Sequence, residues 1–476
     1  MQALYDVAVI GAGPGGYAAA VRAGEIGLKT VCFDPMTNPD DGEAGALGGT
    51  CANVGCVPSK ALLAASAAYA AIRRGSESFG LTAVDIAPDL ERVHRHRAKA
   101  VKDSNRGVAG LFRRAGVEFF AEKAAFKGRT QEGWELATDS GRVVCARHVI
   151  VACGTTARKL PGVEFDEKTI CSNVGALAFE KAPETLGIIG AGVIGLELGS
   201  VWSRFGSRVT VFDMAPSVLA FAGKSVSDAA VKSLSAQGLA FELGVLIVEV
   251  RRLKDGVLVV FEREGRRQEC VFEKLLIAIG RTSLVEGVNP GAVGLEVNAA
   301  GIVGTDDECR TNLPGVWAVG DIVKGPQLAH KATDEGRAVA ERIAGKVRTP
   351  YVCPVPAVVY SHPEFAWVGL TEQAAREAGI DVRVGKAFFS HNAMARAVDE
   401  TEGFVELVVN AADGRLLGAQ TVGAAAADLI ASLAQAIAFG ATAEDLSLVV
   451  WPHPSMSETV QDAAFAALRA IKKGKL

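Results

Sequence analysis

Two glycine-rich turns, each followed by an acid at the same distance, constrain the fold of this chain most strongly. The first lies in "DVAVIGAGPGGYAAAVRAGEIGLKTVCFD" (6–34) and the second in "GIIGAGVIGLELGSVWSRFGSRVTVFD" (187–213). In each, an apolar strand-like segment meets a G-x-G-x-x-G turn, a helical segment follows, and a second strand ends on Asp34 or Asp213. First glycine and acid are 23 residues apart in both copies (34 − 11 and 213 − 190).

This pattern predicts two dinucleotide-binding sites. The glycines permit a tight turn and close approach of backbone to a pyrophosphate, and the helix N-terminus supplies amide donors and a positive dipole end. The acid can then accept hydrogen bonds from the ribose hydroxyls of the adenosine. A phosphate-free α/β turn is the alternative, and the strand–turn–helix context at both places disfavours it. The six glycines concerned are Gly11, Gly13, Gly16, Gly190, Gly192 and Gly195.

Each half also closes on a similar strand and turn. These are "HVIVACGTTARKLPG" (148–162), which contains Gly154, and "LLIAIGRTSLVEG" (275–287), which contains Gly280. A further strand, "GVWAVGD", ends on Asp321, and the carboxyl ends of strands in open α/β sheets are where ligands bind. The chain is therefore predicted to be a duplicated dinucleotide-binding architecture that holds two dinucleotides.

From about residue 355 the sequence pattern changes. It predicts short strands and two Ala-rich helical segments, at about 425–439 and 458–472, without a glycine fingerprint. We predict an α/β fold with two Rossmann-like domains and a C-terminal α+β domain. The expected boundaries are 1–155 for the first dinucleotide domain, completed by a central segment 283–354; 156–282 for the second; and 355–476 for the third.

Composition excludes some functions. A net charge of −4 leaves no polyanion-binding footprint, so nucleic acid is not an expected partner. No apolar run free of Gly or charge approaches the ~20 residues of a membrane span, so no membrane is expected either. The N-terminus passes directly from "MQALY" into the first strand without a basic and apolar leader, which predicts a cytoplasmic protein.

The segment "GGTCANVGCVPSK" (48–60) places Cys51 and Cys56 close together, with four residues between them. A zinc site needs four ligands, and the sequence has no second close cysteine pair, so no metal is expected. A structural disulfide is disfavoured in a cytosolic chain. A redox-active pair fits best, because the following segment is predicted to be a helix whose N-terminus lowers the pKa of a thiol, and Lys60 adds a nearby cation. Between a dithiol and a nicotinamide, a flavin converts the electron pair to hydride.

Together with both glycine turns, "GGTCANVGCVPSKALL", "AVGD", "LAHKA" and "HPSMSE" resemble the flavin disulfide reductases, most closely the dihydrolipoyl dehydrogenases, from about residue 5 to the C-terminus. The resemblance implies FAD on the first fingerprint, one per subunit, NAD on the second, and a homodimer joined through the third domain. It implies NAD-dependent oxidation of protein-bound dihydrolipoamide. The partners would be lipoyl-carrying proteins of 2-oxoacid dehydrogenase complexes or of the glycine cleavage system.

The resemblance also assigns site residues. Cys56 would face the flavin, Cys51 would exchange with the substrate, Lys60 would sit near the flavin and pair with Glu197, and His453 with Glu458 would form an acid–base couple. The expected FAD ligands are Gly11, Gly13, Gly16, Asp34, Thr50, Lys60, Gly154, Asp321 and Ala329; those of NAD are Gly190, Gly192, Gly195, Asp213 and Gly280.

Relatives within the family are separated by missing features. NADPH-dependent members place arginines after the second fingerprint, whereas this chain has "FDMAPSVLAFAG" there. Mercuric reductases carry a C-terminal cysteine pair, which is absent, and the transhydrogenases lack the active disulfide. The sequence departs from the usual pattern in a longer loop before the cysteines, "PMTNPDDGEAGA" (35–46), in Trp451 and in "GAAAAD" (423–428).

Some alternatives stay open at this point. The chain could be a non-enzymatic receptor on the same scaffold, or a plain NADH oxidase or quinone reductase that does not need the thiols. Lys60 with Glu197 could be an ordinary surface pair, and His453 a satisfied turn histidine. His94 and His96 lie in a segment charged at helical spacing, which favours a solvated helix face.

Overall fold

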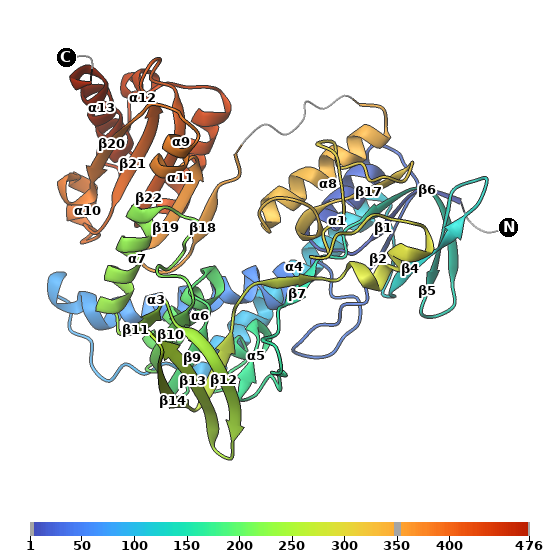
Figure 1. Cartoon of the computed structure of the whole chain (residues 1–476), viewed down its shortest axis with the longest axis horizontal. Coiled ribbons are helices and arrows are strands. Elements are labelled where there is room, and N and C mark those ends of the chain that lie inside the picture. The colour runs from blue at the N-terminus through green and yellow to red at the C-terminus, as the bar shows by residue number, and fades with distance from the viewer. Residues whose placement is uncertain (1–3, 347–353, 475–476) are drawn as a thin grey trace. The chain divides into compact units, whose positions relative to one another are not determined.

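A computed structural model of the chain describes residues 4–346 and 354–474. It forms two compact units, each described by itself (Figure 1). Unit 1 comprises Met1–Leu62, Leu90–Arg158 and Gly280–Tyr351, and unit 2 comprises Leu63–Asp89, Lys159–Ile279 and Val352–Leu476. The predicted boundary at 354–355 falls beside residues 347–353, which lie outside the described residues. The predicted division into three domains stays a prediction.

Unit 1 is built on a seven-stranded sheet in the order β3-β2-β1-β6-β5-β4, with β17 also paired to β6. The strands β1, β2, β3, β6 and β17 pair in parallel, and β4 and β5 join antiparallel. Their bounds are β1 Leu4–Ile10, β2 Thr30–Phe33, β3 Glu118–Phe120, β4 Ala124–Arg129, β5 Trp134–Thr138, β6 Val143–Val151 and β17 Val316–Ala318. A separate ribbon pairs β7 Thr155–Ala157 with β16 Arg281–Ser283.

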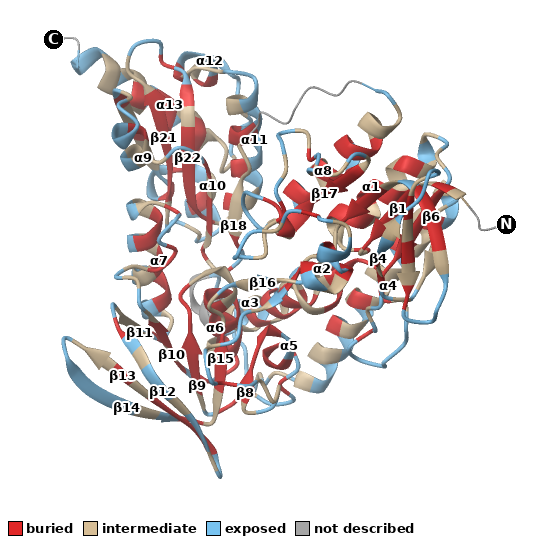
Figure 2. Ribbon diagram, turned by 45° about the vertical axis from the view of Figure 1, so that its right-hand side comes forward, coloured by how far each residue is buried: buried red, intermediate tan, exposed pale blue. Residues whose placement is uncertain are grey.

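Successive side chains of a strand point to opposite sides of the sheet. In unit 1 both faces are buried, because each packs against its own apolar cluster. On β1, Val7 and Val9 join one apolar cluster, with helix α1 (Pro14–Glu25), helix α4 (Leu90–Ala115) and helix α8 (Ala329–Ile343). Ala8 and Ile10 join the cluster on the other face, with β4, β5 and the short helices η1 (Val285–Val288) and η3 (Gly320–Ile322). Figure 2 shows this burial as a nearly continuous red core along β1 and β6.

The two cysteines begin a helical region of their own. Cys51 lies in α2 (Gly49–Val54), and α3 (Cys56–Ser78) starts at Cys56 itself, one residue after Gly55 breaks the helix with φ −140° and ψ −111°. The expected helix is therefore present, but it begins at the second cysteine and not after it. The stretch Gly49–Arg73 is long and apolar enough to cross a bilayer by length and composition alone, and 33% of its apolar 18-residue window is buried.

The second fingerprint lies in unit 2, in an all-parallel sheet of order β11-β10-β9-β15-β8. The strands are β8 Ile170–Cys171, β9 Thr185–Ile189, β10 Arg208–Asp213, β11 Leu239–Leu243 and β15 Lys274–Ile277. Helices α5 (Asn173–Ala176), α6 (Val193–Arg204) and α7 (Lys224–Ala236) connect them. An antiparallel sheet of β12 Leu246–Leu253, β13 Gly256–Arg263 and β14 Arg266–Phe272 shares an apolar cluster with this sheet.

The C-terminal part of unit 2 is an antiparallel sheet, β18-β19-β22-β21-β20. Its strands are β18 Ala357–Val359, β19 Glu364–Gly369, β20 Val382–Phe388, β21 Phe404–Asn410 and β22 Leu416–Gly423. Helices α11 (Ala426–Ala438) and α13 (Glu458–Lys473) pack on it, and both confirm the predicted helical segments. Shorter helices complete it: α9 Glu372–Glu377, α10 Ala393–Ala397 and α12 Ala443–Leu448. The predicted α/β fold with an α+β C-terminal part is confirmed.

Candidate active site

The first glycine turn is a place where backbone packs on backbone. Gly11 has φ +104°, and a Cβ there would lie 2.3 Å from the Ala152 carbonyl oxygen. A Cβ on Gly16 would lie 1.8 Å from the Gly11 oxygen, so helix α1 can start this close to β1 only with glycine at that position. The point corresponding to Cβ of Gly13 has only the Cα of Gly49 within 4.0 Å. Two glycines thus close the turn, and the middle one leaves it open.

The second turn repeats this geometry in unit 2. Gly190 has φ +114° and its Cβ would lie 2.3 Å from the Ala278 oxygen, and a Cβ on Gly195 would lie 2.0 Å from the Gly190 oxygen. A Cβ on Gly192 would meet no described atom within 4 Å. Gly13 and Gly192 are the N-caps of α1 and α6, and neither helix has a side-chain cap. Uncapped amide donors beside an open space are what a pyrophosphate requires.

The two acids are fixed by their turns in the same way. Asp34 Oδ2 accepts a hydrogen bond from Ala12 N at 2.6 Å, and Oδ1 accepts one from Met36 N at 2.9 Å. Asp213 Oδ2 accepts one from Ala191 N at 2.7 Å, and Oδ1 one from Ala215 N at 2.8 Å. Burial raises the pKa of Asp34, and its two amide hydrogen bonds oppose that rise. Both carboxylates are therefore held at the strand end, where an adenosine ribose would lie.

The remaining expected cofactor ligands lie at strand ends and helix starts. Gly154 (φ +69°) follows β6, and Gly280 (φ +107°) follows β15. Neither would meet a described atom within 4 Å if it carried a Cβ. Thr50 lies in the first turn of α2, and Ala329 is the first residue of α8.

Asp321 follows β17 and belongs to a polar network that the sequence did not predict. Thr155 Oγ1 donates to Asp321 Oδ2 at 2.7 Å, and Arg281 Nε donates to Thr155 Oγ1 at 2.6 Å. Arg281 Nε also lies 3.8 Å from Asp321 Oδ2. Burial lowers the pKa of Arg281, while Asp321 and a charged Cys56 oppose that lowering. Asp321 Oδ1 has no partner among the described residues, so an oriented carboxylate oxygen is left for a ligand.

The cysteine pair is built directly against the first turn. A Cβ on Gly49, in the first turn of α2, would lie 2.6 Å from the Cα of Gly13. Cys51 is half-buried, Cys56 is exposed, and both are free thiols in the structure. A hydrogen bond with Cys56, followed by burial, raises the pKa of Cys51, and Lys60 opposes that rise. Within the described part of the chain no third Cys, His, Asp or Glu joins a metal-type cluster, so nothing there favours zinc.

Asn53, between the two cysteines, is a fully buried polar residue that the sequence analysis missed. Its Nδ2 donates to Gly49 O at 2.9 Å and to Ala46 O at 3.1 Å. Its Oδ1 accepts from Asn105 Nδ2 of α4 at 3.1 Å, and Asn105 Nδ2 also lies 2.5 Å from Leu47 O. These bonds fix the start of the cysteine helix to α4. A lone Asn in a motif carries no sequence signal for this role.

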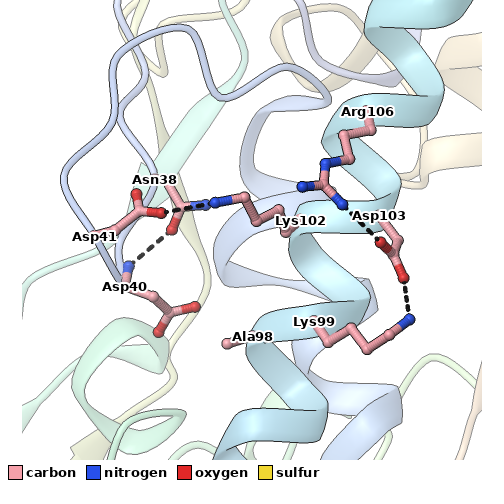
Figure 3. A pocket seen from close by; sticks show the side chains of 8 residues that line it. All are labelled: Asn38, Asp40, Asp41, Ala98, Lys99, Lys102, Asp103 and Arg106. Carbon is pink, nitrogen blue, oxygen red and sulfur yellow. Dashed lines mark hydrogen bonds and ion pairs between the residues drawn. The ribbon is translucent and has the colours of Figure 1, made fainter.

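The loop 35–46 is anchored on the same helix. Arg97, which is buried, pairs with Asp40 at 2.5 Å, and Lys102 pairs with Asp41 at 3.5 Å. Figure 3 shows the hollow that remains between loop and helix, with Lys99 and Arg106 turned to Asp103 on the helix itself. Every charged group that lines it is therefore paired within the chain, and the hollow offers no free charge to a ligand. His94 contacts Arg97 and His96 is exposed, as expected for a helix face.

Lys60 and Glu197 lie in different units, so their pairing stays a prediction. Lys60 is in the second turn of α3, and its Nζ lies 3.4 Å from Ser59 Oγ. Glu197 is buried in α6, where its Oε1 accepts a hydrogen bond from Tyr360 N at 3.0 Å. A buried carboxylate of this kind needs such partners.

His453 and Glu458 are brought together as the motif predicts. His453 Nδ1 lies 2.9 Å from Glu458 Oε1, and Glu458 Oε2 accepts from Ser455 N at 2.9 Å. The hydrogen bond with His453 and that with Ser455 lower the pKa of Glu458. The His453 side chain is 71% exposed, so its Nε2 faces outward from this unit. The apolar side chains exposed on the neighbouring elements are Phe439, Leu448, Val449 and Val450.

We expect Asn53→Ala to loosen α2 and expose Cys51. Losing two donors and one acceptor of a buried amide costs ~1–3 kcal/mol, which raises the population of the open helix by about 5- to 150-fold. The alkylation rate of Cys51, measured on the native protein in a Cys56→Ser background, should rise by that factor.

Asn312→Ala is the matched control, because Asn312 is exposed and donates to Gly294 O at 2.8 Å in the same unit. It should leave the alkylation rate unchanged. An unchanged rate in Asn53→Ala would show that Asn53 does not hold the helix.

Comparisons with known proteins place this geometry in a family. Residues 5–336 match the family "pyridine nucleotide-disulphide oxidoreductase", and residues 355–464 match its dimerisation domain. A dihydrolipoyl dehydrogenase of Cupriavidus necator is 43% identical over 468 residues, 98% of each chain. A mitochondrial dihydrolipoyl dehydrogenase of Pisum sativum is 38% identical over 97% of this chain and 91% of that one. In fold, the chain is similar to LpdA of Mycobacterium tuberculosis (TM-score 0.87, 24% identity, 97% and 99% of the two chains). The chain belongs to the pyridine nucleotide-disulphide oxidoreductase family.

Proposed function

We propose that this chain is a dihydrolipoyl dehydrogenase. It oxidises dihydrolipoamide to lipoamide and reduces NAD to NADH, with FAD as its resident cofactor. The observation that carries the proposal is the pair Cys51–Cys56, with Cys51 on helix α2, which starts against the first glycine turn, and Cys56 at the start of α3. The full-length relatives named dihydrolipoyl dehydrogenase support the choice of substrate.

The residues present fit the two dinucleotides. The adenosine and pyrophosphate of FAD would be held around the first turn, by Gly11, Gly13, Gly16 and Asp34. Asp321, through its open Oδ1, would hold the part of FAD beyond the pyrophosphate. Around the second turn, Gly190, Gly192, Gly195 and Asp213 would hold NAD. When bound, the flavin supplies an acceptor for an electron pair from a thiol, and the nicotinamide an acceptor for hydride.

The chemistry of the chain itself is a thiol–disulfide exchange. One thiol of dihydrolipoamide loses its proton, and the thiolate attacks Cys51 of the oxidised pair. The new S–S bond forms as the Cys51–Cys56 bond breaks, and Cys56 leaves as a thiolate. The second substrate thiol, deprotonated in turn, attacks the substrate sulfur of the mixed disulfide and releases Cys51 as a thiolate that takes up a proton. Lipoamide leaves with its own disulfide, and the pair keeps two electrons.

The location of the pair favours Cys56 as the sulfur that leaves as a thiolate. It is the first residue of the 23-residue helix α3, and the positive end of a helix dipole stabilises an anion there. Arg281 adds a buried cation whose field reaches Cys56, and Lys60 follows one turn into the helix. In contrast, a hydrogen bond with Cys56 and burial raise the pKa of Cys51, which suits the sulfur that takes up a proton when it is released.

His453 is the proposed base. An imidazole can take a thiol proton near pH 7, and Glu458 on Nδ1 orients the ring and stabilises the cation formed. Glu458 is in turn fixed by the Ser455 amide. In this chain His453 is exposed, and so are the apolar residues Leu448 and Val450 shortly before it in the sequence and Phe439 at the end of α11, which suits burial in a two-fold interface. The match to a dimerisation domain supports a homodimer, in which His453 would serve the cysteines of the other subunit.

The lipoyl group would be presented by a carrier protein of a 2-oxoacid dehydrogenase complex or of the glycine cleavage system, in the cytoplasm. A plain NADH oxidase or quinone reductase would keep full activity without the thiols, and a receptor would bind no flavin. Removal of the Cys56 thiolate therefore separates both of these from the proposed enzyme.

Cys56→Ser should keep FAD bound but eliminate lipoamide turnover. It should also eliminate the long-wavelength absorbance that appears when dihydrolipoamide reduces the wild-type protein, because no thiolate remains at that position. NADH oxidation by an artificial acceptor should persist. A visible spectrum and both turnover assays check this.

Cys270→Ser is the matched control, since Cys270 is a half-buried thiol on β14 in the other unit. It should change none of the three readouts. Lipoamide reduction that survives in Cys56→Ser would exclude the relay proposed here.

NAD should be preferred over NADP by at least about 100-fold, because a 2′-phosphate would meet the Asp213 carboxylate and like charges in contact cost several kcal/mol. The measurement is kcat/KM for NADH and NADPH. Asp213→Asn should lower the ratio of kcat/KM for NADH to kcat/KM for NADPH. Asp228→Asn should leave that ratio unchanged, because Asp228 is an exposed residue of the same unit that pairs with Lys224. Comparable kcat/KM values in the wild type would refute the assignment.

His453→Gln should slow lipoamide reduction by ~10²–10⁴-fold, the usual span for a lost acid–base group. Its arrangement across the interface is tested by coexpressing Cys51→Ser chains with His453→Gln chains. A heterodimer then has one site with both defects and one intact site, so random pairing should restore about a quarter of the wild-type activity.

The His453→Gln and Cys51→Ser homodimers, each loaded with FAD, give the baseline. A purified mixed dimer that binds FAD but stays inactive would mean that His453 does not act on the other subunit.

A further inference from the structure

Helix α8 begins with a buried ion pair that the reaction described above does not use. Lys331 Nζ lies 2.8 Å from Glu335 Oε1, with side chains 4% and 10% exposed. Burying two charges is costly unless further hydrogen bonds satisfy their remaining donors and acceptors. The partners of this pair therefore show what it is for.

Both partners bind the same residue, Gly320. Gly320 N donates to Glu335 Oε2 at 2.8 Å, and Lys331 Nζ donates to Gly320 O at 3.3 Å. Gly320 has φ +84°, in the left-handed region. The following turn packs against the lysine side chain at Gly325, where a Cβ would lie 2.8 Å from Lys331 Cε. The ion pair thus holds the donor and the acceptor of one residue at a turn.

The next residue is Asp321, the carboxylate expected to bind FAD. Its backbone direction is set by Gly320, and its Oδ2 is held by Thr155, which leaves Oδ1 open. Helix α8 is itself fixed against α1, since a Cβ on Gly336 would lie 2.2 Å from the Gly15 oxygen. The ion pair therefore links Asp321 to the helix that starts at the first glycine turn.

We propose that Lys331 and Glu335 are positioning residues that clamp Gly320 and thereby hold the Asp321 carboxylate for FAD. The proposal rests on the proposed function in one respect, that the first fingerprint binds FAD. Lys331 lies in the motif "LAHKA", but no role was predicted for it or for Glu335, because a Lys and a Glu four apart are typical of an exposed helix pair.

The double variant removes the clamp without leaving a lone buried charge. Lys331→Met with Glu335→Leu replaces both charges by apolar groups of similar volume, which buried ion pairs often tolerate. Glu335→Gln is the conservative second variant. Glu341→Gln is the matched control, because the Arg22–Glu341 pair (2.8 Å) also joins α1 to α8 but does not touch Gly320.

The readout is the FAD dissociation constant, from the flavin fluorescence that appears as purified holoenzyme is diluted. Losing hydrogen bonds to charged groups should raise it by ~10- to 100-fold in the double variant and less in Glu335→Gln, with Glu341→Gln unchanged. NAD binding, at a separate turn in unit 2, should not change. In an Asp321→Ala background the clamp variants should add little, because the clamp acts through Asp321.

A folded double variant with wild-type FAD affinity would overturn the proposal. If the double variant does not fold, wild-type affinity in Glu335→Gln would overturn it equally. A loss in the Asp321→Ala background as large as in the wild type would mean that the pair acts through general packing. A wild-type protein that binds no FAD would instead overturn the proposed function.

Discussion

The rest of the structure depends on backbone-to-backbone contact around the first turns of α1. Gly16 lets α1 start against the Gly11 carbonyl, and Gly49 lets the cysteine helix start against Gly13. Gly336 lets α8 approach the Gly15 carbonyl. At each contact a Cβ would lie between 1.8 and 2.6 Å from a backbone atom, closer than any side chain can come. A dinucleotide turn, a thiol pair and the helix behind Asp321 can therefore occupy one small region only because glycine is present at each contact.

Once these elements are so close, buried polar groups fix their orientation. Asn53 ties α2 to α4, Asp34 ties β2 to the glycine turn, and the Lys331–Glu335 pair ties α8 to the turn before Asp321. Each of these groups is buried and hydrogen-bonded, and removing one partner leaves the other unsatisfied at a cost of about 1–3 kcal/mol. Close packing brings the elements of the site together, and the buried hydrogen bonds fix how these elements are oriented.

What could be predicted from the sequence follows from this division. The glycines and acids recur at fixed spacing because the strand–turn–helix geometry demands it, so the two turns were predicted from the residues themselves, whereas the His453–Glu458 contact was expected only from the family resemblance. Asn53, Thr155 and Arg281 were missed because each acts through a tertiary contact that leaves no local pattern, and the Lys331–Glu335 pair was missed because its spacing is also that of an ordinary exposed helix pair. Helix α3 begins at Cys56 and not after it, since the break is set by the backbone angles of Gly55. The roles of Lys60 and Glu197 depend on both units together, so they remain predictions.

The two glycine turns are near-copies, and the difference between them bears on how each dinucleotide is used. Gly49 of the cysteine helix lies against the turn at Gly13, and the same unit holds Asp321 through Thr155, so several elements of that unit can hold a ligand there. At Gly192 no described atom lies within 4 Å of the Cβ position, and the acid Asp213 is the main polar group held beside it. A coenzyme that must leave after every turnover needs few contacts and an open path, whereas a resident flavin needs many. Within its own unit the first turn has such neighbours, which suits a resident flavin, whereas the described residues of unit 2 leave the second turn open, which suits a coenzyme that leaves after each turnover.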